Sequence, residues 1–314
     1  METGLVSVIL PNRNHAQYLA HALAALCAQT WIKLEIIVVD DASTDDSCAL
    51  VERLAADDKR IGLLRLARHA GVNAAVEHGL AHARGEFLYC AAVDDWVAPE
   101  FFERSVAALR SHPASAFCFS DPMEDRGQRR VFQLFLSLTP RAFTADEIFY
   151  ELRHNYFHIS SNTVLYRRGL FKEAGGFRTD LNWLSDWFIN YLLALRHGAS
   201  YLPEALTCLT VRTDSYSAVN LRQHAAQHAL ILRVLDLLAE PDFADVQPRF
   251  QGAALLPEYR LRDIGWLLAA PAHRHYLTAL LIRRIIGRDL WSHLRPLAPV
   301  SVRHLLRRLS SARR

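Results

Sequence analysis

The chain has 314 residues, of which 51% are hydrophobic and 22% charged, and its net charge is +3. This composition excludes disordered and fibrous proteins, and the length suits one large domain with an appendage or two modest domains. No apolar run reaches the roughly 18 residues of a membrane-spanning helix. Five cysteines form no CxxC pair and the N-terminus has no signal-peptide pattern. These features argue against a disulfide framework or a structural zinc and predict a cytoplasmic protein.

Strands and helices alternate through the first third of the chain. Short apolar, β-branched runs predict buried strands, and the stretches between them have a helical pattern. The predicted strands are residues 5–10, 34–39, 61–66 and 87–92; the predicted helices are residues 15–29, a segment ending near 56, and 72–83. Ser43 or Thr44 is expected to cap the second helix, with Asp45 and Asp46 in its first turn. The alternation predicts an α/β fold with a parallel sheet and right-handed crossovers.

Polar clusters follow three of the predicted strands. They are residues 11–14 (Pro-Asn-Arg-Asn), residues 40–43 (Asp-Asp-Ala-Ser) and the pair Asp94-Asp95. Because ligands bind at the carboxyl ends of strands in such sheets, we expect a binding site there.

The pattern changes after about residue 113. Short strands and helices are predicted at residues 116–120, 162–166, 187–196 and 207–212, and helices at 221–238, 259–270 and 273–286. We therefore predict a domain over residues 1–215, made of a first half at 1–112 and a second half at 113–215. A helical C-terminal region with a basic tail is predicted at 216–314.

Each acidic cluster has two interpretations when it is considered alone. Asp94-Asp95 suits a hard divalent cation, but aspartate is equally common in turns and helix caps. Turn and cap chemistry is favoured for Asp41. Asp186, at the start of a predicted helix, is either a general base or a carboxylate that complements the helix dipole beside a capping Ser185. A helix N-terminus is expected to make it a weaker base.

Several familiar signatures are missing from the sequence. It contains no GxGxxG, GxxxxGK[ST], GxSxG or HExxH motif, which removes the main marks of dinucleotide, P-loop and common hydrolase enzymes. The histidines show no convergent spacing with acids or cysteines, so no role is assigned to His69, His78, His82, His154 and His158.

Taken in order, the clusters resemble family 2 glycosyltransferases of the GT-A fold. The resemblance runs from Leu5 to Ser217, and six or more matches occur in order at compatible spacings. The matching segments are Val6–Asn14, Gln29–Trp31, Glu35–Asp45, Gly71–Ala75, Ala83–Phe87, Gly175–Phe177 and Ser185-Asp186. The resemblance implies a Rossmann-like, mostly parallel central sheet flanked by helices, with a nucleotide-binding half at 1–112 and an acceptor-side half at 113–215.

The resemblance also implies roles for particular residues. Asp41 contacts the nucleotide base, Asp94 and Asp95 hold Mg²⁺ or Mn²⁺ against a diphosphate, and Asp186 takes the proton from the acceptor hydroxyl. The donor-binding set that it implies is Pro11, Asn12, Arg13, Asp41, Asn73 and Asp94. The implied reaction is transfer of a hexose, with inversion, from a nucleotide-diphosphate sugar, with uridine as the base, to a glycan or lipid-linked acceptor in polysaccharide assembly.

The sequence departs from the family pattern at several positions. The metal motif usually reads Asp-x-Asp-Asp, and its first acid is replaced by Ala92. Arg13 stands where an aromatic residue is common, and its planar guanidinium can still stack on a base. An Arg-Asn pair is replaced by Val76-Glu77, and Ser185 stands where the base motif has Glu. A catalytically silent domain that binds nucleotide sugar or scaffolds partners is therefore the alternative hypothesis.

The C-terminal tail is strongly basic. Residues 283–314 carry a charge of +8, against −5 for the rest of the chain. Arginine mixed with aliphatic residues at helical spacing predicts one of two arrangements. The first is a helix on an anionic membrane, at the inner face of the cytoplasmic membrane, and the second is a solvated basic face whose apolar stripe packs on the protein body. No nucleic-acid-binding motif accompanies the arginines, so nucleic acid is not an expected partner.

Overall fold

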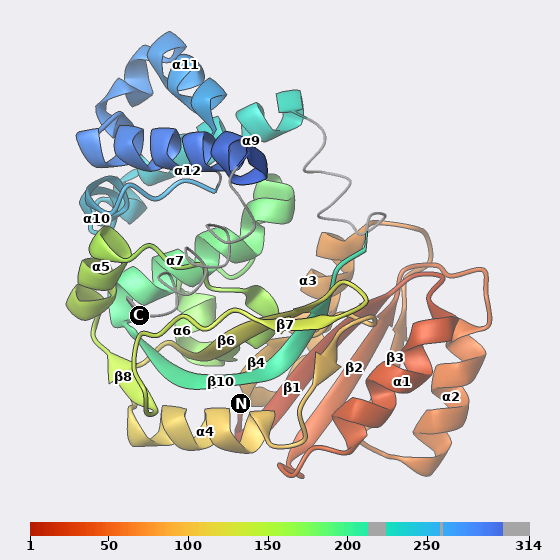
Figure 1. Ribbon diagram of the computed structural model, residues 1–314. Coiled ribbons are helices and arrows are strands. Elements are labelled where there is room, and N and C mark those ends of the chain that lie inside the picture. The colour runs from red at the N-terminus through yellow and green to blue at the C-terminus, as the bar shows by residue number, and fades with distance from the viewer. Residues whose placement is uncertain (213–223, 258–259, 298–314) are drawn as a thin grey trace. The chain divides into compact units, whose positions relative to one another are not determined.

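The structure is a computed structural model of the chain, and it describes residues 1–212, 224–257 and 260–297 (Figure 1). The chain divides into two compact units. Unit 1 comprises Met1–Ile148 and Phe157–Ala218, and unit 2 comprises Phe149–Tyr156 and Val219–Arg314. The sequence predicts one boundary, between residues 215 and 216. The structure divides the chain near that point and also assigns a second segment, Phe149–Tyr156, to the C-terminal unit.

A ten-stranded sheet forms the centre of unit 1. Its strands are β1 (Glu2–Asn12), β2 (Leu34–Asp40), β3 (Ile61–Arg65), β4 (Gly85–Cys90), β5 (Trp96–Val97), β6 (Phe117–Asp125), β7 (Arg129–Val131), β8 (Arg141–Phe143), β9 (Leu165–Arg167) and β10 (Ala199–Thr210). The order is β3-β2-β1-β4-β9-β6-β10-β5, with β7 paired to β6 and β8 to β10. The predicted α/β class is confirmed.

The two halves of the sheet differ in strand direction. Strands β1 to β4 are parallel to one another, as predicted. Beyond them, β9 runs antiparallel to both β4 and β6, and β10 is parallel to β6. Strands β5, β7 and β8 are antiparallel additions, so the sheet is parallel in its first half and mixed in its second.

Helices cover the sheet of unit 1. They are α1 (Ala16–Cys27), α2 (Ser47–Asp57), α3 (Val72–His82), α4 (Phe101–Ser111), α6 (Arg168–Glu173) and α7 (Ser185–His197), with 3-10 turns η1 (Ser161–Thr163) and η2 (Thr179–Leu184). Helix α5 (Ala145–His154) begins in unit 1 and ends in the segment assigned to unit 2.

The strand β1 is buried on both faces because helices lie on both sides of it. Val6, Val8 and Leu10, which alternate along the strand, belong to one buried cluster with the inner leucines of α1. On the other face, Gly79 of α3 lies so close to Ile9 that an added Cβ would sit 2.5 Å from its side chain. This double burial explains why the strand is a continuous apolar run.

The start of α2 differs from the prediction. The helix begins at Ser47, so Ser43 and Thr44 do not cap it, and no side chain forms a cap hydrogen bond. Asp45 precedes the helix and accepts hydrogen bonds from Ala16 N–H (3.0 Å) and Ser47 N–H (3.0 Å). The polar residues after β2 therefore form a loop that binds the start of α1 instead of extending the helix.

Unit 2 is helical, as the sequence predicts for its described residues. It contains α9 (His224–Leu238), α10 (Gln247–Gly252), α11 (Leu261–Ala269) and α12 (Ala279–Leu297), with 3-10 turns η3 (Pro241–Phe243) and η4 (Pro271–Tyr276). The described part of the chain contains no helix that is long and apolar enough to cross a membrane.

Arg284 of α12 is bonded inside unit 2. Its guanidinium donates to the carbonyl oxygens of Leu152 and Ala253 and lies 5.2 Å from the ring centroid of Tyr156. Ile285 beside it is fully buried. The start of the basic tail therefore packs against its own unit, which favours the second of the two predicted interpretations there. The rest of the basic tail, residues 298–314, lies outside the described residues.

Candidate active site

The loops after β1 and β2 are joined by hydrogen bonds. Asn12 Nδ2 donates to Asp40 Oδ2 (3.1 Å), and Thr44 N–H donates to Asn14 Oδ1 (2.7 Å). Asp41 N–H donates to the Asn12 carbonyl (2.8 Å). The Asn12 Oδ1 atom is buried and accepts no hydrogen bond from the described residues. Two of the three predicted polar clusters therefore form one hydrogen-bonded structure.

Asp41 lies at the centre of this structure and is 3% exposed. Its carboxylate accepts hydrogen bonds from Ala70 N–H (2.7 Å), Gly71 N–H (2.9 Å) and His69 Nδ1 (2.7 Å). Burial by itself raises the pKa of Asp41, but these three hydrogen bonds outweigh that effect and hold the pKa below its ordinary value. A carboxylate has about four acceptor positions, so one remains for a ligand. His69, to which the sequence analysis assigned no role, thus positions Asp41.

The other predicted donor-binding residues lie around the same loops. Pro11 is half-buried near the end of β1, where it pairs with Val39, and Arg13 is exposed in the loop that follows. Asn73 is half-buried in the first turn of α3. Their contacts with a nucleotide stay predictions.

Asp94 and Asp95 follow β4 and differ in exposure. The Asp95 side chain is buried, and its Oδ1 accepts a hydrogen bond from Thr210 N–H (2.9 Å). Burial, together with the charge of Asp94, raises the pKa of Asp95 to about 7, although the hydrogen bond from Thr210 N–H and the nearby Asn162 side chain favour the charged form. Asp94 is half-buried, and its Oδ2 lies 3.8 Å from Arg212 Nη1. The pair is therefore oriented by the end of β10.

Asp186 lies in the first turn of α7 and is partly buried. Burial raises its pKa above the ordinary value, although hydrogen bonds from the Ser161 hydroxyl and from Trp187 N–H, and the charge of His158, act in the opposite direction. The expectation that the helix N-terminus makes Asp186 a weaker base is therefore wrong, because burial dominates. Ser185 does not cap the helix, and its hydroxyl is buried without a hydrogen-bond partner among the described residues.

The 3-10 turn η1 lies beside both the Asp94-Asp95 pair and Asp186. Ser161 lies close enough to Asp186, and the next residue, Asn162, close enough to Asp95, for each to favour the charged form of its carboxylate. The turn is itself fixed, because Tyr89 Oη donates to the Asn162 carbonyl (2.9 Å) and Asn190 Nδ2 donates to Ser161 Oγ (3.1 Å). The predicted metal pair and the predicted base are therefore neighbours at the carboxyl end of β4.

Several residues at this site were missed by the sequence analysis. They are Ser161, Asn162, Thr210 and Arg212, all from the second half of unit 1. The Arg212 guanidinium also lies over the Tyr18 ring, 4.7 Å from its centroid. Each is a single polar residue without a neighbouring motif, so only the fold brings it to the carboxylates.

The residues present supply some, but not all, of the oxygen ligands that a hard divalent cation needs. Asp94 and Asp95 supply oxygen ligands, which Mg²⁺ and Mn²⁺ prefer. No group of three or more His, Cys, Asp or Glu side chains suited to a metal occurs among the described residues. A cation here needs further oxygens from water or from a ligand, which is the usual way in which Mg²⁺ is bound beside phosphates.

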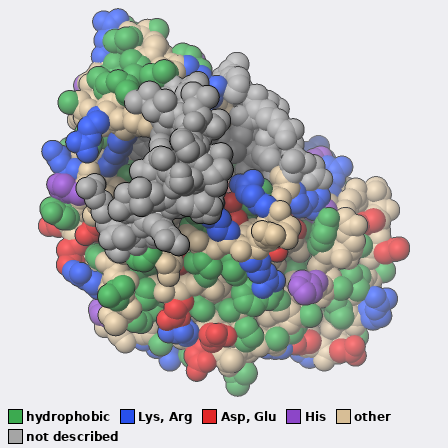
Figure 2. Space-filling model, viewed as in Figure 1, with side chains coloured by type: hydrophobic (Ala, Val, Ile, Leu, Met, Phe, Trp, Pro, Cys, Tyr) green, Lys and Arg blue, Asp and Glu red, His purple; other side chains and the backbone are tan. Residues whose placement is uncertain are grey.

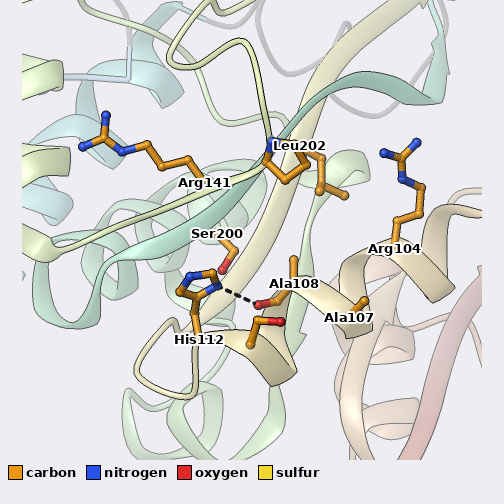
Figure 3. Close-up of a pocket in the computed structure, with 9 residues that line it drawn as sticks. Arg104, Ala107, Ala108, His112, Arg141, Ser200 and Leu202 are labelled. Atoms are coloured by element: carbon orange, nitrogen blue, oxygen red, sulfur yellow. Dashed lines mark hydrogen bonds between the residues drawn. The ribbon is translucent and has the colours of Figure 1, made fainter.

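A cavity of about 290 Å³ lies elsewhere on unit 1, at the other end of β10 (Figure 3). It is lined by residues of α4, β8 and β10, including Arg104, Arg141, His112 and Ser200. Both arginines are paired, Arg104 with Glu204 and Arg141 with Glu147. The cavity contains none of the predicted site residues, and its cations are already neutralised.

Comparison with solved structures identifies the class of fold. Chain 1–349 of TarS from S. aureus, crystallised with UDP, superposes with a TM-score of 0.60 at 21% identity, covering 93% of this chain and 85% of that one. The mannosyltransferase PcManGT from Pyrobaculum calidifontis, in complex with GDP-Man and Mn²⁺, gives 0.59 at 19% identity, covering 98% and 79%. The fold is that of the GT-A glycosyltransferases.

Sequence comparison then gives the family. The profile of the Glycosyl transferase family 2 matches residues 7–175, more than half of the chain. The chain therefore belongs to this family. The succinoglycan biosynthesis protein ExoO of Rhizobium meliloti is 25% identical over 253 residues, which are 76% of this chain and 67% of ExoO. Other curated glycosyltransferases match over shorter stretches, 33% to 50% of their own length.

Proposed function

We propose that this protein transfers a hexose, with inversion, from a nucleotide-diphosphate sugar to a hydroxyl of a glycan acceptor in polysaccharide assembly. The observation that carries the proposal is that Asp95 and Asp186 lie beside consecutive residues, Asn162 and Ser161, of one short turn. Inverting transfer needs a cation site for the leaving diphosphate and a base for the attacking hydroxyl on opposite sides of one sugar. The family and the fold support the transferase class.

The donor half of the proposal rests on the loops after β1, β2 and β4. Asp41 keeps an acceptor position for the base or ribose. Mg²⁺ or Mn²⁺ held by Asp94 and Asp95 would neutralise the charge that develops on the diphosphate. Arg212 adds a positive charge beside Asp94, where that diphosphate is expected. The complexes of TarS with UDP and of PcManGT with GDP-Man and Mn²⁺ support a donor of this kind.

The acceptor half rests on Asp186. Burial raises the pKa of Asp186, which makes its carboxylate a better proton acceptor than that of an ordinary aspartate. Ser161 lies beside the carboxylate, and Trp187 N–H donates to Oδ1 at 2.7 Å. Asp186 is therefore proposed to take the proton from the acceptor hydroxyl as it attacks the anomeric carbon. The cytoplasmic location and a lipid-linked acceptor stay predictions.

The test is donor hydrolysis and nucleotide binding by the full chain. A panel of UDP-, GDP- and dTDP-sugars is incubated with Mn²⁺, Mg²⁺ or EDTA, and UDP and GDP binding is followed by calorimetry. The wild type is expected to release one nucleoside diphosphate only when metal is present, and Asp95→Asn to lose this release. Asp57→Asn, an exposed aspartate at the end of α2, is the matched control and should behave as the wild type.

Two outcomes separate this proposal from a silent domain. Nucleotide binding that needs metal, without transfer to any acceptor and with no effect of Asp186→Asn, would mean a nucleotide-sugar-binding module. The absence of metal-dependent nucleotide binding in the wild type would overturn the proposed reaction. The replacement of the first motif acid by Ala92 makes this comparison necessary.

A further inference from the structure

The hairpin formed by β6 and β7 holds a second cavity, of about 420 Å³. Its lining residues are Glu124, Arg126, Gln128, Arg129, Arg130 and Phe132. The residues from 126 to 130 are all exposed. In Figure 2, basic side chains gather near the centre of the view, over the part of the sheet where β6, β7 and β10 lie in Figure 1. The cavity is thus open to solvent and is lined by more arginines than acids.

The cavity lies next to the candidate active site. Asp125, the last residue of β6, pairs with Thr210 of β10, whose N–H holds Asp95. The Arg129 guanidinium lies over the ring of Trp96, 5.2 Å from its centroid, and Trp96 directly follows Asp95 in the chain. A ligand that reaches the carboxylates from this side therefore passes the hairpin.

The arginines of the hairpin are only partly neutralised. Arg126 pairs with Glu124 (3.0 Å), and Arg129 lies 3.7 Å from Asp125. Arg130 stacks on Phe132 at 4.7 Å and has no carboxylate within 4.0 Å among the described residues. With three arginines and one glutamate, the lining carries a net charge of +2. A positive excess next to the site of transfer attracts an anionic ligand.

We propose that this cavity binds the acceptor and selects one that carries an acidic group, a carboxylate or a phosphate, near the hydroxyl to be glycosylated. A guanidinium binds either group through two parallel hydrogen bonds. Glu124 and Gln128 supply acceptors and donors for sugar hydroxyls, and the Phe132 ring supplies an apolar surface. The concave shape and the acids beside the arginines fit a saccharide better than a membrane surface. This inference rests on the proposed transferase function and names its acceptor class.

The experiment uses the full chain and three defined probes. They are a tetrasaccharide of alternating glucuronic acid and N-acetylglucosamine, glucose 1-phosphate, and neutral maltotetraose, each titrated calorimetrically in low salt. The variant is Arg129→Gln/Arg130→Gln, and the matched control is Arg53→Gln/Lys59→Gln, which removes the same charge from exposed positions of unit 1. UDP and GDP titrations with Mn²⁺ are run in parallel on all three proteins.

We expect at least one acidic probe to bind roughly tenfold or more tightly than maltotetraose, and the hairpin variant to lose roughly tenfold or more of that affinity. The control and all nucleotide titrations should stay within about twofold. Tighter binding of the uronic acid tetrasaccharide assigns the acidic group as a carboxylate, and tighter binding of glucose 1-phosphate assigns it as a phosphate.

Two results would overturn the inference: equal affinity for neutral and acidic probes, or equal loss of affinity in the hairpin and control variants. Metal-dependent nucleotide binding that persists in either case leaves the proposed function in place. Its absence from the wild type counts against the proposed function and not against the anion site.

Discussion

The two halves of unit 1 contribute to the candidate site in different ways. In residues 1–112, parallel strands end side by side, and the polar residues that follow each strand are consecutive in the chain. In residues 113–212, single side chains come from a 3-10 turn, a helix and the end of a strand. A parallel sheet brings neighbouring loops together by its own geometry, whereas a mixed sheet does so only through specific long-range contacts.

The hydrogen bonds show the same contrast. The loop after β1 bonds the loop after β2 over separations of about thirty residues, as in the bond from Asn12 to Asp40. Thr210, by comparison, bonds Asp95 across 115 residues. The first half therefore supplies Asp41, Asp94 and Asp95, and the second half supplies the proposed base, Asp186, together with residues that position the carboxylates. Four substitutions test this division, two in each half.

Asp186→Asn, in the second half, is expected to have the largest effect. Loss of a general base lowers the rate of transfer by roughly 10²–10⁴-fold. Nucleotide affinity, which depends on the first half, should stay within about twofold, because the substitution keeps the shape of the side chain. Steady-state rates and nucleotide calorimetry measure the two quantities. Asp180→Asn, in the turn just before α7, is the control. A normal rate of transfer by the Asp186→Asn variant would mean that Asp186 is not the general base.

Asn162→Ala tests whether the second half orients the metal pair. Loss of a residue that holds a metal ligand costs about 10–100-fold in metal affinity. Mn²⁺-dependent nucleotide binding should weaken accordingly, while metal-free binding stays unchanged. Asn155→Ala is the control, because the Asn155 side chain is exposed and donates to the half-buried Glu151 carboxylate at 3.0 Å. If both variants bind alike, Asp95 is oriented by the first half and by Thr210, without help from the turn.

Glu35→Gln tests the stability of the first half. Glu35 accepts hydrogen bonds from Ser7 Oγ, Arg84 N–H (2.7 Å) and Arg84 Nε (2.9 Å), which join β1, β2 and the start of β4. Its loss should cost about 1–3 kcal/mol of unfolding free energy at pH 7. Glu52→Gln, whose carboxylate forms one exposed pair with Arg65, should cost less than about 1 kcal/mol.

The same variant predicts a pH dependence. Burial raises the pKa of Glu35, but its hydrogen bonds outweigh burial and hold the pKa below its ordinary value. The stabilisation by the carboxylate is therefore complete above about pH 4.5 and is lost as the pH falls through the folded-state pKa. The difference between wild type and Glu35→Gln in urea unfolding should shrink below about pH 4. A difference that grows on acidification would contradict this assignment.

Ala42→Gly should have the smallest effect. Ala42 directly follows Asp41 and has a positive φ of 56°, which costs a residue with a side chain about 1 kcal/mol. Glycine relieves that cost but increases the entropy of the unfolded chain, so stability should change by less than about 0.5 kcal/mol. Ala49→Gly, in the exposed face of α2, should lose about 1 kcal/mol. Equal losses at the two positions would mean that the loop after β2 is not strained.

The same division explains how far the sequence could predict this protein. The strands from β1 to β4 and the polar residues after them follow from local patterns, since buried parallel strands are continuous apolar runs. The residues Ser161, Asn162 and Thr210 have no local pattern, because their positions depend on contacts with distant segments. The pKa of Asp186 was predicted in the wrong direction because burial, which a sequence does not display, outweighs the helix N-terminus.

The turn at Ser161 and Asn162 has a consequence for energetics. Two events of the proposed reaction, departure of the diphosphate and removal of the acceptor proton, depend on carboxylates that lie beside consecutive residues of one short segment. Such groups do not respond independently, because a shift of the shared backbone moves both. In a double-mutant cycle, the effects of substituting Asp95 and Asp186 should therefore fail to add. Whether a substitution at Asp95 is tolerated during evolution would then depend on the residue at position 186, and the reverse.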